Sequence, residues 1–339
     1  MVSDVLIVPP SWRSQLEKAG YAIYNHSAVE ICHWTKKSLK DKGDCYKNRF
    51  YRVDTWGCMQ ITQAVIWCPN RCIYCWRPNE EFESNIYMLP KEKVDPPEVT
   101  LEELRKLRKE LLIGFKGNSI VNKDKLDKTL EKPTHITFSL AGEPLLYPYV
   151  PESILYIKKN WPWVKSIFVV TNGLVPEALE RMVKLNAYPT QLYISFTAPN
   201  PELYKKISRS LYIDYWERFI KSLKIASKMK TRRVARITII KGLNDARKLF
   251  EQWIELLDIL NPHFIEVKAF MLLGYSRYRL SIVNMPSHKY IVQWSKEFVE
   301  HLDGFEYWDE HKHSRVALLK NRKFGMDIDP IIKSVEPNV

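Results

Sequence analysis

Short apolar, β-branched runs alternate with helix-like patterns along the chain from about Trp56 onward. Each run is followed by a stretch in which apolar residues recur with helical spacing. The six runs cover residues 59–67, 135–140, 166–171, 191–196, 234–240 and 264–270. Strands that alternate with helices indicate a parallel sheet, and six such units predict an α/β fold, a partial (β/α)6 barrel.

The pattern also predicts how the chain is divided. Residues 1–55 are expected to form an irregular N-terminal extension, 56–301 the barrel, and 302–339 a C-terminal tail in which apolar residues 316–319 add an edge strand. The helix over 101–115 is expected to begin at a capping box made by Thr100 and Glu103. In such barrels the active residues lie where strands end, so polar motifs at those ends are candidates for the site.

Composition narrows the class of protein. With 339 residues, 45% of them hydrophobic, the chain can bury one large core or two modest ones. No run approaches the roughly 18 apolar residues that a membrane span needs. Residues 1–10 have neither a charged start nor an apolar stretch long enough for export. We therefore expect a soluble, cytoplasmic protein.

The formal net charge of +13 is concentrated in two segments. Residues 205–236 hold eleven basic and two acidic residues, and residues 36–52 hold seven basic and two acidic ones. Such patches are typical of a surface that binds a polyanion, and we prefer a nucleic acid. A solvated helix face is the alternative. The candidate RNA-binding residues are Arg209, Lys221, Lys224, Lys228, Arg232 and Arg233.

All six cysteines lie between Cys32 and Cys75, and the last three, Cys68, Cys72 and Cys75, have a three-then-two spacing. Three thiolates on one short loop can hold a [4Fe-4S] cluster and leave its fourth iron without a protein ligand. Structural zinc sites usually have four ligands, and disulfides belong to oxidising compartments. An iron–sulfur site therefore fits better than zinc, disulfides or buried free thiols.

With Tyr74 before its last cysteine, this motif resembles that of the radical S-adenosylmethionine (radical SAM) superfamily. The resemblance implies that the amino and carboxylate groups of SAM chelate the open iron. An electron from the cluster would then release a 5′-deoxyadenosyl radical. The cofactor sets the reaction class, and the protein supplies position and electrostatics.

Residues 139–144 are similar to the Gly-Gly-Glu-Pro motif of radical SAM enzymes, with Ala141 in place of the first glycine. Gly142 permits close backbone approach, and the Glu143 carboxylate can accept hydrogen bonds from the SAM ammonium group. Further polar residues at strand ends suit the ribose hydroxyls or the carboxylate of SAM, although plain strand-end capping is the alternative. These residues are Thr171, Asn172, Ser195 and Thr197.

Residues 75–77, 266–271, 274–277 and 284–288, together with evenly spaced Cys32, Cys45 and Cys58, resemble the tRNA 4-demethylwyosine synthase family. The most specific element is the pair of cysteine triplets, since twelve residues stand in each gap of the upstream one. The resemblance implies that this triplet holds a second [4Fe-4S] cluster. Its open iron suits a bidentate 2-oxo acid such as pyruvate. Three isolated thiols packed as small hydrophobes are the alternative.

The same resemblance implies the reaction. N1-methylguanosine at position 37 of tRNA-Phe would condense with two carbons of pyruvate to form tricyclic 4-demethylwyosine. Lys47, two residues after Cys45, either forms a Schiff base with pyruvate or belongs to the basic RNA-facing surface. Nothing resembling a flavin domain precedes Cys32, so we expect an external low-potential electron donor, and we expect a monomer.

Two other functions stay open on the sequence alone. One is a radical SAM enzyme that acts on a protein or a small metabolite, in which case the basic segments would be incidental. The other is a non-enzymatic nucleic-acid-binding protein that holds zinc on its cysteines. RNA binding at graded salt concentrations separates the first from a tRNA-modifying enzyme, and the brown colour of an iron–sulfur protein excludes the second.

Overall fold

One mixed sheet runs through the computed structural model, which describes residues 5–79 and 88–324. Its strands are β1 (Tyr21–Tyr24), β2 (Ser27–Glu30), β3 (Cys58–Thr62), β4 (His135–Phe138), β5 (Ser166–Thr171), β6 (Gln191–Phe196), β7 (Arg232–Ile239), β8 (Phe264–Ala269), β9 (Phe305–His311) and β10 (Val316–Asn321). Their order is β1-β2-β3-β4-β5-β6-β7-β8-β10-β9. Strands β3 to β8 are parallel, and the strands at both ends join antiparallel.

The predicted parallel core is confirmed, strand by strand, in β3 to β8. Its first strand is shorter than predicted, because β3 ends at Thr62 and the chain then turns. The Thr62 hydroxyl accepts from the Ala64 amide at 3.2 Å, and the Trp67 amide donates to the Ala64 carbonyl oxygen at 3.3 Å. This turn carries the chain out of the sheet and into the loop that holds Cys68.

Helices connect the strands and also precede and follow the parallel core. They are α1 (Pro10–Lys18), α2 (His33–Ser38), α3 (Tyr46–Tyr51), α4 (Pro97–Ile113), α5 (Lys123–Leu130), α6 (Val150–Asn160), α7 (Pro176–Lys184), α8 (Pro201–Ser208), α9 (Tyr215–Ala226), α10 (Phe250–Leu260) and α11 (His288–Glu300). Within the described ranges, no helix is both long and apolar enough to cross a membrane.

Three expectations about the chain outside the core were wrong. Residues 5–55 are not irregular, because they contain α1, α2 and α3 and the hairpin β1–β2, which extends the sheet beyond β3. The strand predicted at 316–319 exists as β10, but β9 takes the edge of the sheet. Helix α4 begins at Pro97, so Thr100 lies inside it and accepts from Gln63 Nε2 at 2.6 Å instead of capping the helix.

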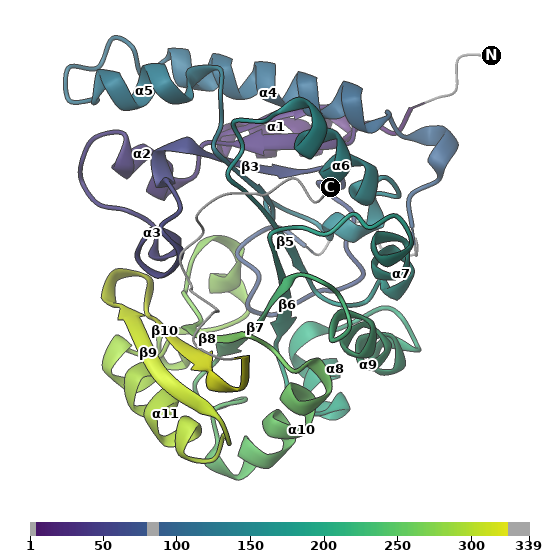
Figure 1. Cartoon of the computed structure of the whole chain (residues 1–339), viewed down its shortest axis with the longest axis vertical. Helices are drawn as coiled ribbons and strands as arrows, with labels where there is room; N and C mark the ends of the chain where they lie inside the picture. Colours follow the sequence, from purple (N-terminus) through teal and green to yellow (C-terminus); the bar gives the residue numbers. More distant parts are fainter. Residues whose placement is uncertain (1–4, 80–87, 325–339) are drawn as a thin grey trace.

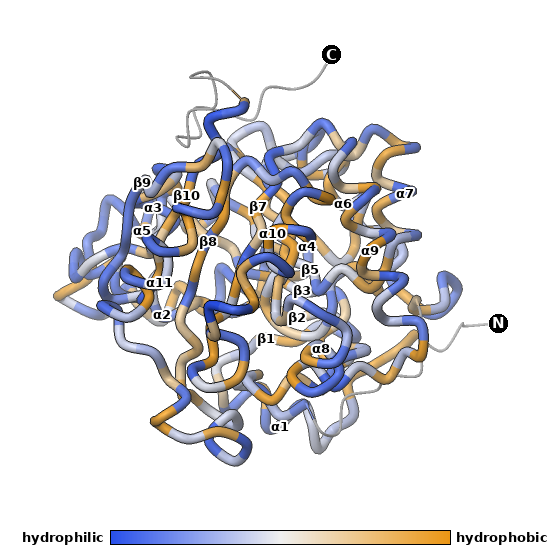
Figure 2. The backbone as a smooth tube through the Cα atoms, turned by 90° about the horizontal axis from the view of Figure 1, so that it is seen from below, coloured by the Kyte–Doolittle hydropathy of each residue, from blue (hydrophilic) through white to orange (hydrophobic). Residues whose placement is uncertain are grey.

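The two faces of the parallel core differ in their side chains, because successive residues of a strand point to opposite faces. One face carries residues such as Ile136, Val169 and Ile194, which belong to the main hydrophobic core. Helices α6 to α9 cover this side, and α2 and α3 lie on the other (Figure 1). Hydrophobic stretches gather in the central strands, whereas hydrophilic ones lie mostly toward the periphery (Figure 2).

The face of the parallel core on the side of α2 and α3 is called the concave face below. Helix α3 packs against one end of it. Its residues Tyr46, Phe50 and Tyr51 form a second hydrophobic cluster with side chains of the sheet, namely Phe168, Tyr193, Val234, Phe264, Val316 and Leu318. The Tyr51 hydroxyl donates to buried Glu266 at 2.8 Å, and Arg236 pairs with the same carboxylate at 3.1 Å. Because Cys45 and Lys47 begin this helix, its packing fixes where their side chains enter the concave side.

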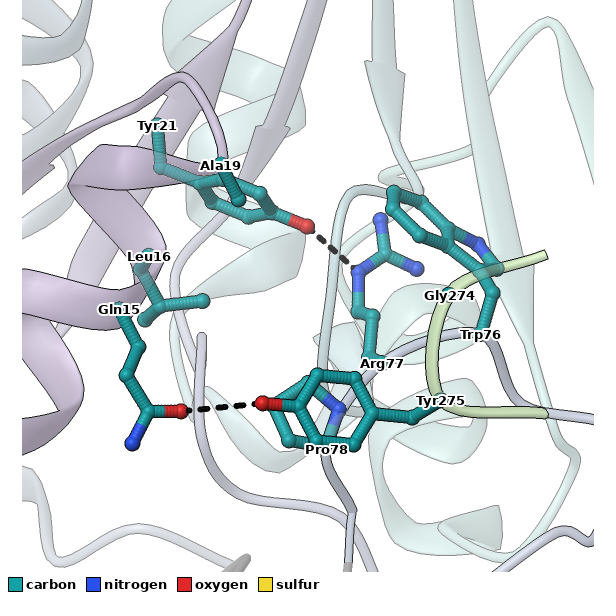
Figure 3. Close-up of a pocket in the computed structure, with 9 residues that line it drawn as sticks. All are labelled: Gln15, Leu16, Ala19, Tyr21, Trp76, Arg77, Pro78, Gly274 and Tyr275. Atoms are coloured by element: carbon teal, nitrogen blue, oxygen red, sulfur yellow. Dashed lines mark hydrogen bonds between the residues drawn. The ribbon is translucent and has the colours of Figure 1, made fainter. Parts of the chain in front are cut away.

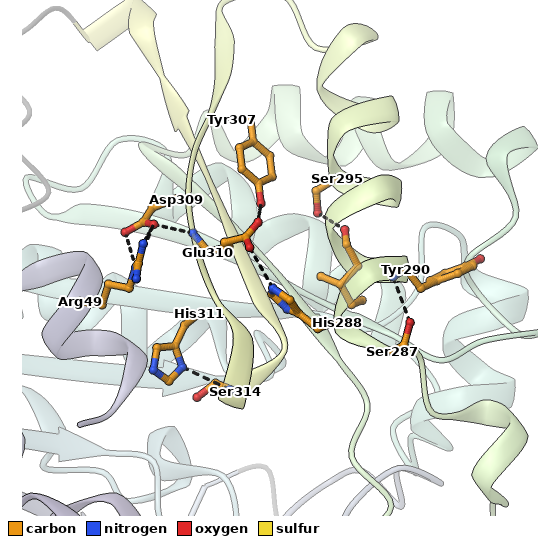
Figure 4. Close-up of polar contacts among 11 residues, drawn as sticks. Arg49, Ser287, His288, Tyr290, Ser295, Tyr307, Asp309, Glu310, His311 and Ser314 are labelled. Carbon is orange, nitrogen blue, oxygen red and sulfur yellow. Dashed lines mark hydrogen bonds and ion pairs between the residues drawn. The ribbon is translucent and has the colours of Figure 1, made fainter. Parts of the chain in front are cut away.

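The C-terminal hairpin β9–β10 braces both α3 and α11 (Figure 4). Arg49 of α3 forms an ion pair with Asp309 at 2.7 Å, and His288 Nε2 lies 3.2 Å from Glu310. Ser287 caps α11 by accepting from the Tyr290 amide at 3.1 Å. Ser287 and His288 of the 284–288 motif therefore have structural contacts, Ser287 with the start of α11 and His288 with the hairpin.

Candidate functional site

The loop that carries Cys68, Cys72 and Cys75 follows β3 at the carboxyl end of the parallel strands. Two backbone hydrogen bonds of 2.9 Å hold it to the end of α8, from the Arg71 and Ile73 amides. The Arg279 guanidinium also donates to the carbonyl oxygens of Cys72 and Cys75 at 2.8 and 3.0 Å. These contacts with α8 and Arg279 fix the backbone of the loop.

The three thiols of this loop are half-buried and lie near one another. Burial raises the pKa of the Cys72 thiol to about 12, with the neighbouring Cys75 adding to the effect. The pKa of Cys68 is raised well above its usual value for the same reasons, with Cys72 as the neighbour. An iron ion reverses this balance, since it binds thiolates and releases their protons. This donor set suits an iron–sulfur cluster.

Within residues 5–79 and 88–324, no three His, Cys, Asp or Glu side chains already stand in a metal-holding arrangement. The ligand sets Cys68/Cys72/Cys75 and Cys32/Cys45/Cys58 therefore stay predictions.

Glu143 lies beside the loop of Cys68, Cys72 and Cys75, which is called the cluster loop below. Only 2% of the surface of Glu143 is exposed. Its carboxylate accepts from the Thr171 hydroxyl at 2.6 Å and from the Asn172 amide at 2.8 Å. Burial raises its pKa to about 7, although these hydrogen bonds oppose the shift. Asn172 Nδ2 is 4.0 Å from Cys68 Sγ. The structure thus brings together Glu143, Thr171 and Asn172, which the sequence placed on different strand ends.

Gly142 is required by the close approach of the same two segments. Its φ is +66°, and a Cβ there would stand 1.9 Å from the Ala64 carbonyl oxygen and 2.7 Å from that of Trp67. The Glu143 amide donates to the Trp67 carbonyl oxygen at 2.7 Å. The turn before Cys68 and the turn at Glu143 are therefore packed backbone against backbone.

The other candidate SAM residues have more distant or structural contacts. The Tyr74 hydroxyl is hydrogen-bonded to Cys72. The pKa of Tyr74 is raised, mainly because its hydroxyl is shielded from water and to a lesser extent because the Cys72 thiol lies beside it. Thr197 shares a 2.7 Å hydrogen bond with Ser208, which in turn interacts with Cys72. Ser195 is paired in register with Arg236 of β7, on the concave face. Thr197 thus contacts the loop through Ser208, and its role in SAM binding stays a prediction.

The three upstream cysteines line one cavity of about 540 Å³ on the concave side of the sheet. Cys32, Cys45 and Cys58 all line it, although they come from the starts of α2, α3 and β3. Burial raises the pKa of Cys45 to about 11, with Cys32 adding to the effect, and also raises that of Cys58. Three coupled thiols around a cavity of this size fit a cluster better than isolated packing residues.

Lys47 points into the same cavity. Its Nζ lies 3.4 Å from the Thr137 hydroxyl and 4.9 Å from the ring centre of Phe168. Burial lowers the pKa of this lysine, which Cys58 and Cys45 partly oppose. A buried amine beside aromatic rings is poorly placed to attract phosphate on the surface. The geometry therefore favours a role for Lys47 inside the cavity.

Two further cations line this cavity, and the sequence reasoning did not single them out. Arg236 is held by Glu266, and Lys268 donates to the Ser314 carbonyl oxygen at 3.1 Å. Burial lowers the pKa of Lys268 to about 8, and Arg236 adds to the effect. The alternation in β8 was the available signal, because Glu266 and Lys268 stand two residues apart on the same face.

The predicted RNA-binding residues do not form one surface. Arg233 was a wrong choice: it is 6% exposed, and its guanidinium donates to the carbonyl oxygens of Asn261 and Met229. Arg232 is half-buried, donates to Gln191 at 2.6 Å and packs over Tyr51, and its contact with RNA stays a prediction. Arg209 borders the cluster loop. The others lie on or just after α9 and stay predictions, namely Lys221, Lys224 and Lys228.

Comparisons with known proteins agree on one family. The model of the radical SAM superfamily matches residues 64–257, more than half of the chain, and the model described as wyosine base formation matches residues 260–321. The S-adenosyl-L-methionine-dependent tRNA 4-demethylwyosine synthase of Pyrococcus abyssi is 41% identical over 324 residues, which cover 95% of this chain and 91% of the relative. The Mus musculus synthase TYW1 is 33% identical over 323 residues, which cover 95% of this chain and 43% of that protein.

Two solved structures are similar along the whole length. TYW1 with a lysine–pyruvate adduct bound has a TM-score of 0.83 at 34% identity, and the match covers 96% of this chain and 99% of that one. Archaeal TYW1 has a TM-score of 0.75 at 31% identity, covering 96% and 100%. These likenesses confirm the radical SAM α/β fold. The chain belongs to the tRNA 4-demethylwyosine synthase family within the radical SAM superfamily.

Proposed function

We propose that the protein converts N1-methylguanosine at position 37 of tRNA-Phe into 4-demethylwyosine, using SAM and two carbons of pyruvate. One observation carries this proposal: the buried amine of Lys47 and three cysteine thiols line a single cavity beside the SAM-cluster loop. A relative of similar fold binds a lysine–pyruvate adduct, which supports pyruvate as the occupant.

The SAM site is proposed at the loop of Cys68, Cys72 and Cys75. Cys68, Cys72 and Cys75 would hold a [4Fe-4S] cluster there, which together with SAM would supply the radical that removes a hydrogen atom from the N-methyl group. Glu143 is held in place by Thr171 and Asn172 and accepts hydrogen bonds from the SAM ammonium group. Because burial raises the Glu143 pKa to about 7, a nearby cation is what keeps this carboxylate charged.

The pyruvate site is proposed at the cavity lined by Cys32, Cys45, Cys58 and Lys47. Cys32, Cys45 and Cys58 would hold a second [4Fe-4S] cluster, which can orient a 2-oxo acid by its carboxylate and keto oxygens. Burial lowers the pKa of Lys47, which favours the neutral amine that can condense with the ketone. Arg236 and Lys268 attract the carboxylate from the sheet side. The carbon radical of the N-methyl group would add to the keto carbon, and the bond between that carbon and the carboxyl carbon would break, so that the carboxyl carbon leaves as a one-carbon fragment. Water is lost when Lys47 condenses with the ketone, and the exocyclic amine of the guanine would then displace the Lys47 amine and close the ring as an imine.

The remaining partners are proposed from the same reasoning. The substrate tRNA would approach from the carboxyl ends of the parallel strands, where Arg209 lies. The electrons would come from an external low-potential donor, and the protein would act as a monomer.

The proposal is tested with reconstituted protein, SAM, dithionite, pyruvate and tRNA that carries N1-methylguanosine. Mass spectrometry of the nucleosides should detect the tricyclic base only when all components are present. Borohydride added during turnover should label the peptide that contains Lys47, and Lys47→Arg should abolish both label and product, since a guanidinium stays protonated. A fully active Lys47→Arg variant would remove the imine from the mechanism.

A further inference from the structure

A small pocket lies beside Trp76, and Figure 3 draws the nine residues that line it. The cavity lined by Cys32, Cys45 and Cys58 is called the main cavity below. Its volume is about 170 Å³, and α1 forms one wall with Gln15, Leu16 and Ala19. The opposite wall is Trp76, Arg77 and Tyr275. Trp76 lines both hollows, so whatever enters the pocket lies one side chain away from the cavity of the cysteines.

The aromatic wall is held rigidly but is open to solvent. Gly274 packs against the Trp76 backbone, where an added Cβ would stand 2.2 Å from the Trp76 carbonyl oxygen. The Tyr275 amide donates to this oxygen at 2.9 Å. Yet Trp76 is 42% and Tyr275 39% exposed. Rigid aromatic rings that stay exposed in this way provide a surface on which another flat ring can stack.

Arg77 adds positive charge and a free donor to the pocket. It stacks 4.1 Å from the Trp76 ring centre, and its Nε donates to the Tyr21 hydroxyl at 2.6 Å. Its Nη2 is shielded from water and has no acceptor within the described part of the chain. A buried donor without an acceptor is costly, so a ligand that brings an acceptor is favoured there.

Size and chemistry together indicate an aromatic heterocycle. A cavity of about 150 Å³ accommodates a benzene ring, so this pocket is large enough for a planar base that projects partly into solvent. Exposed aromatic side chains beside arginine are typical of sites that bind unpaired nucleobases, which stack on the rings while the phosphates face the positive charge. Tyr278 and Arg277 extend the same surface beyond Tyr275.

We propose that this pocket holds an unpaired nucleobase of the substrate tRNA, next to the base that enters the main cavity. The inference rests on the proposed function, because an enzyme that modifies a base within a loop must withdraw it from its neighbours and contact the flanking nucleotides. The shared Trp76 wall places the flanking base beside the reacting one. Tyr275 and Arg77 then set the register of the loop and take no part in the chemistry.

The test uses the holoenzyme and an anticodon stem-loop RNA with 2-aminopurine beside the methylated guanosine. Stacking on Trp76 and Tyr275 should quench the fluorescence of this base. Tyr275→Ala should weaken RNA binding roughly 5- to 100-fold, the effect of losing one base–aromatic stack, and should reduce the quenching. The loss should appear in the KM for RNA and not in kcat. Tyr275→Phe should behave like the wild type.

Two more variants keep the test decisive. Ala19→Phe fills the pocket from α1 and should weaken RNA binding without removing Tyr275. Trp308→Ala removes an aromatic ring of similar exposure, 46%, far from the pocket, and should change nothing. Normal RNA affinity in both Tyr275→Ala and Ala19→Phe, or an equal loss in Trp308→Ala, would overturn the inference. If the wild type quenches the probe but makes no modified base, the proposed function fails and the pocket stands.

Discussion

Gly142→Ala tests whether the close packing of two turns holds the SAM site together. The added Cβ would stand 1.9 Å from the Ala64 carbonyl oxygen, and the residue would keep a φ of +66°. Positive φ costs an L-residue about 1–2 kcal/mol. Relieving the overlap by moving the backbone adds roughly 1–3 kcal/mol. We therefore expect a loss of about 2–5 kcal/mol in the free energy of unfolding, out of the 5–15 kcal/mol typical of a domain.

Gly242 provides a matched control, because its φ is +80° and nothing lies within 4 Å of the position of an added Cβ. Gly242→Ala should lose only the positive-φ cost of about 1–2 kcal/mol. Urea unfolding of the cluster-free proteins measures this difference. After reconstitution, Gly142→Ala should also cleave SAM slowly, since the shift displaces Cys68 and Glu143. Equal stability and equal SAM cleavage in the two variants would refute the packing argument.

Two further predictions follow from the cavities. Wild-type protein should bind about eight irons, and alanine variants of either cysteine triplet about four, because three thiolates suffice for one cluster. Anaerobic iron and sulfide analysis measures both numbers. Loss of all iron in one variant would contradict two independent sites. Burial lowers the Lys268 pKa to about 8, so its charge, and with it the attraction for pyruvate, should fade as the pH rises through that value. The KM for pyruvate should then rise, whereas Lys268→Met should show a high KM that does not change over the same pH range.

The parallel core could be predicted because its strands are short apolar runs separated by helices. The ends could not. β1 and β9 carry mixed polar and apolar residues, and only their neighbours in the sheet make them strands. The capping box at Thr100 failed since Pro96 and Pro97 start the helix earlier.

For the site, spacing along the chain predicted the cysteine ligands, and strand ends predicted Glu143 and Thr171, which the structure places in hydrogen-bonding contact. Charge counting misjudged Arg233, because a sequence does not show that its guanidinium is buried among carbonyl oxygens. Lys268 was not singled out, because the alternation in β8 places it on the same face as Glu266 but does not show that this face lines the cavity of Lys47 and the cysteines.

Isotope-labelled pyruvate tests the central claim most directly. Reconstituted protein is incubated with SAM, dithionite, tRNA that carries N1-methylguanosine, and pyruvate labelled at one carbon at a time. The masses of the nucleosides are then measured by mass spectrometry. The account predicts that labels at the keto and methyl carbons are retained in the tricyclic base, whereas the carboxyl label is lost. A base that forms without any pyruvate carbon, or that keeps the carboxyl label, would contradict it.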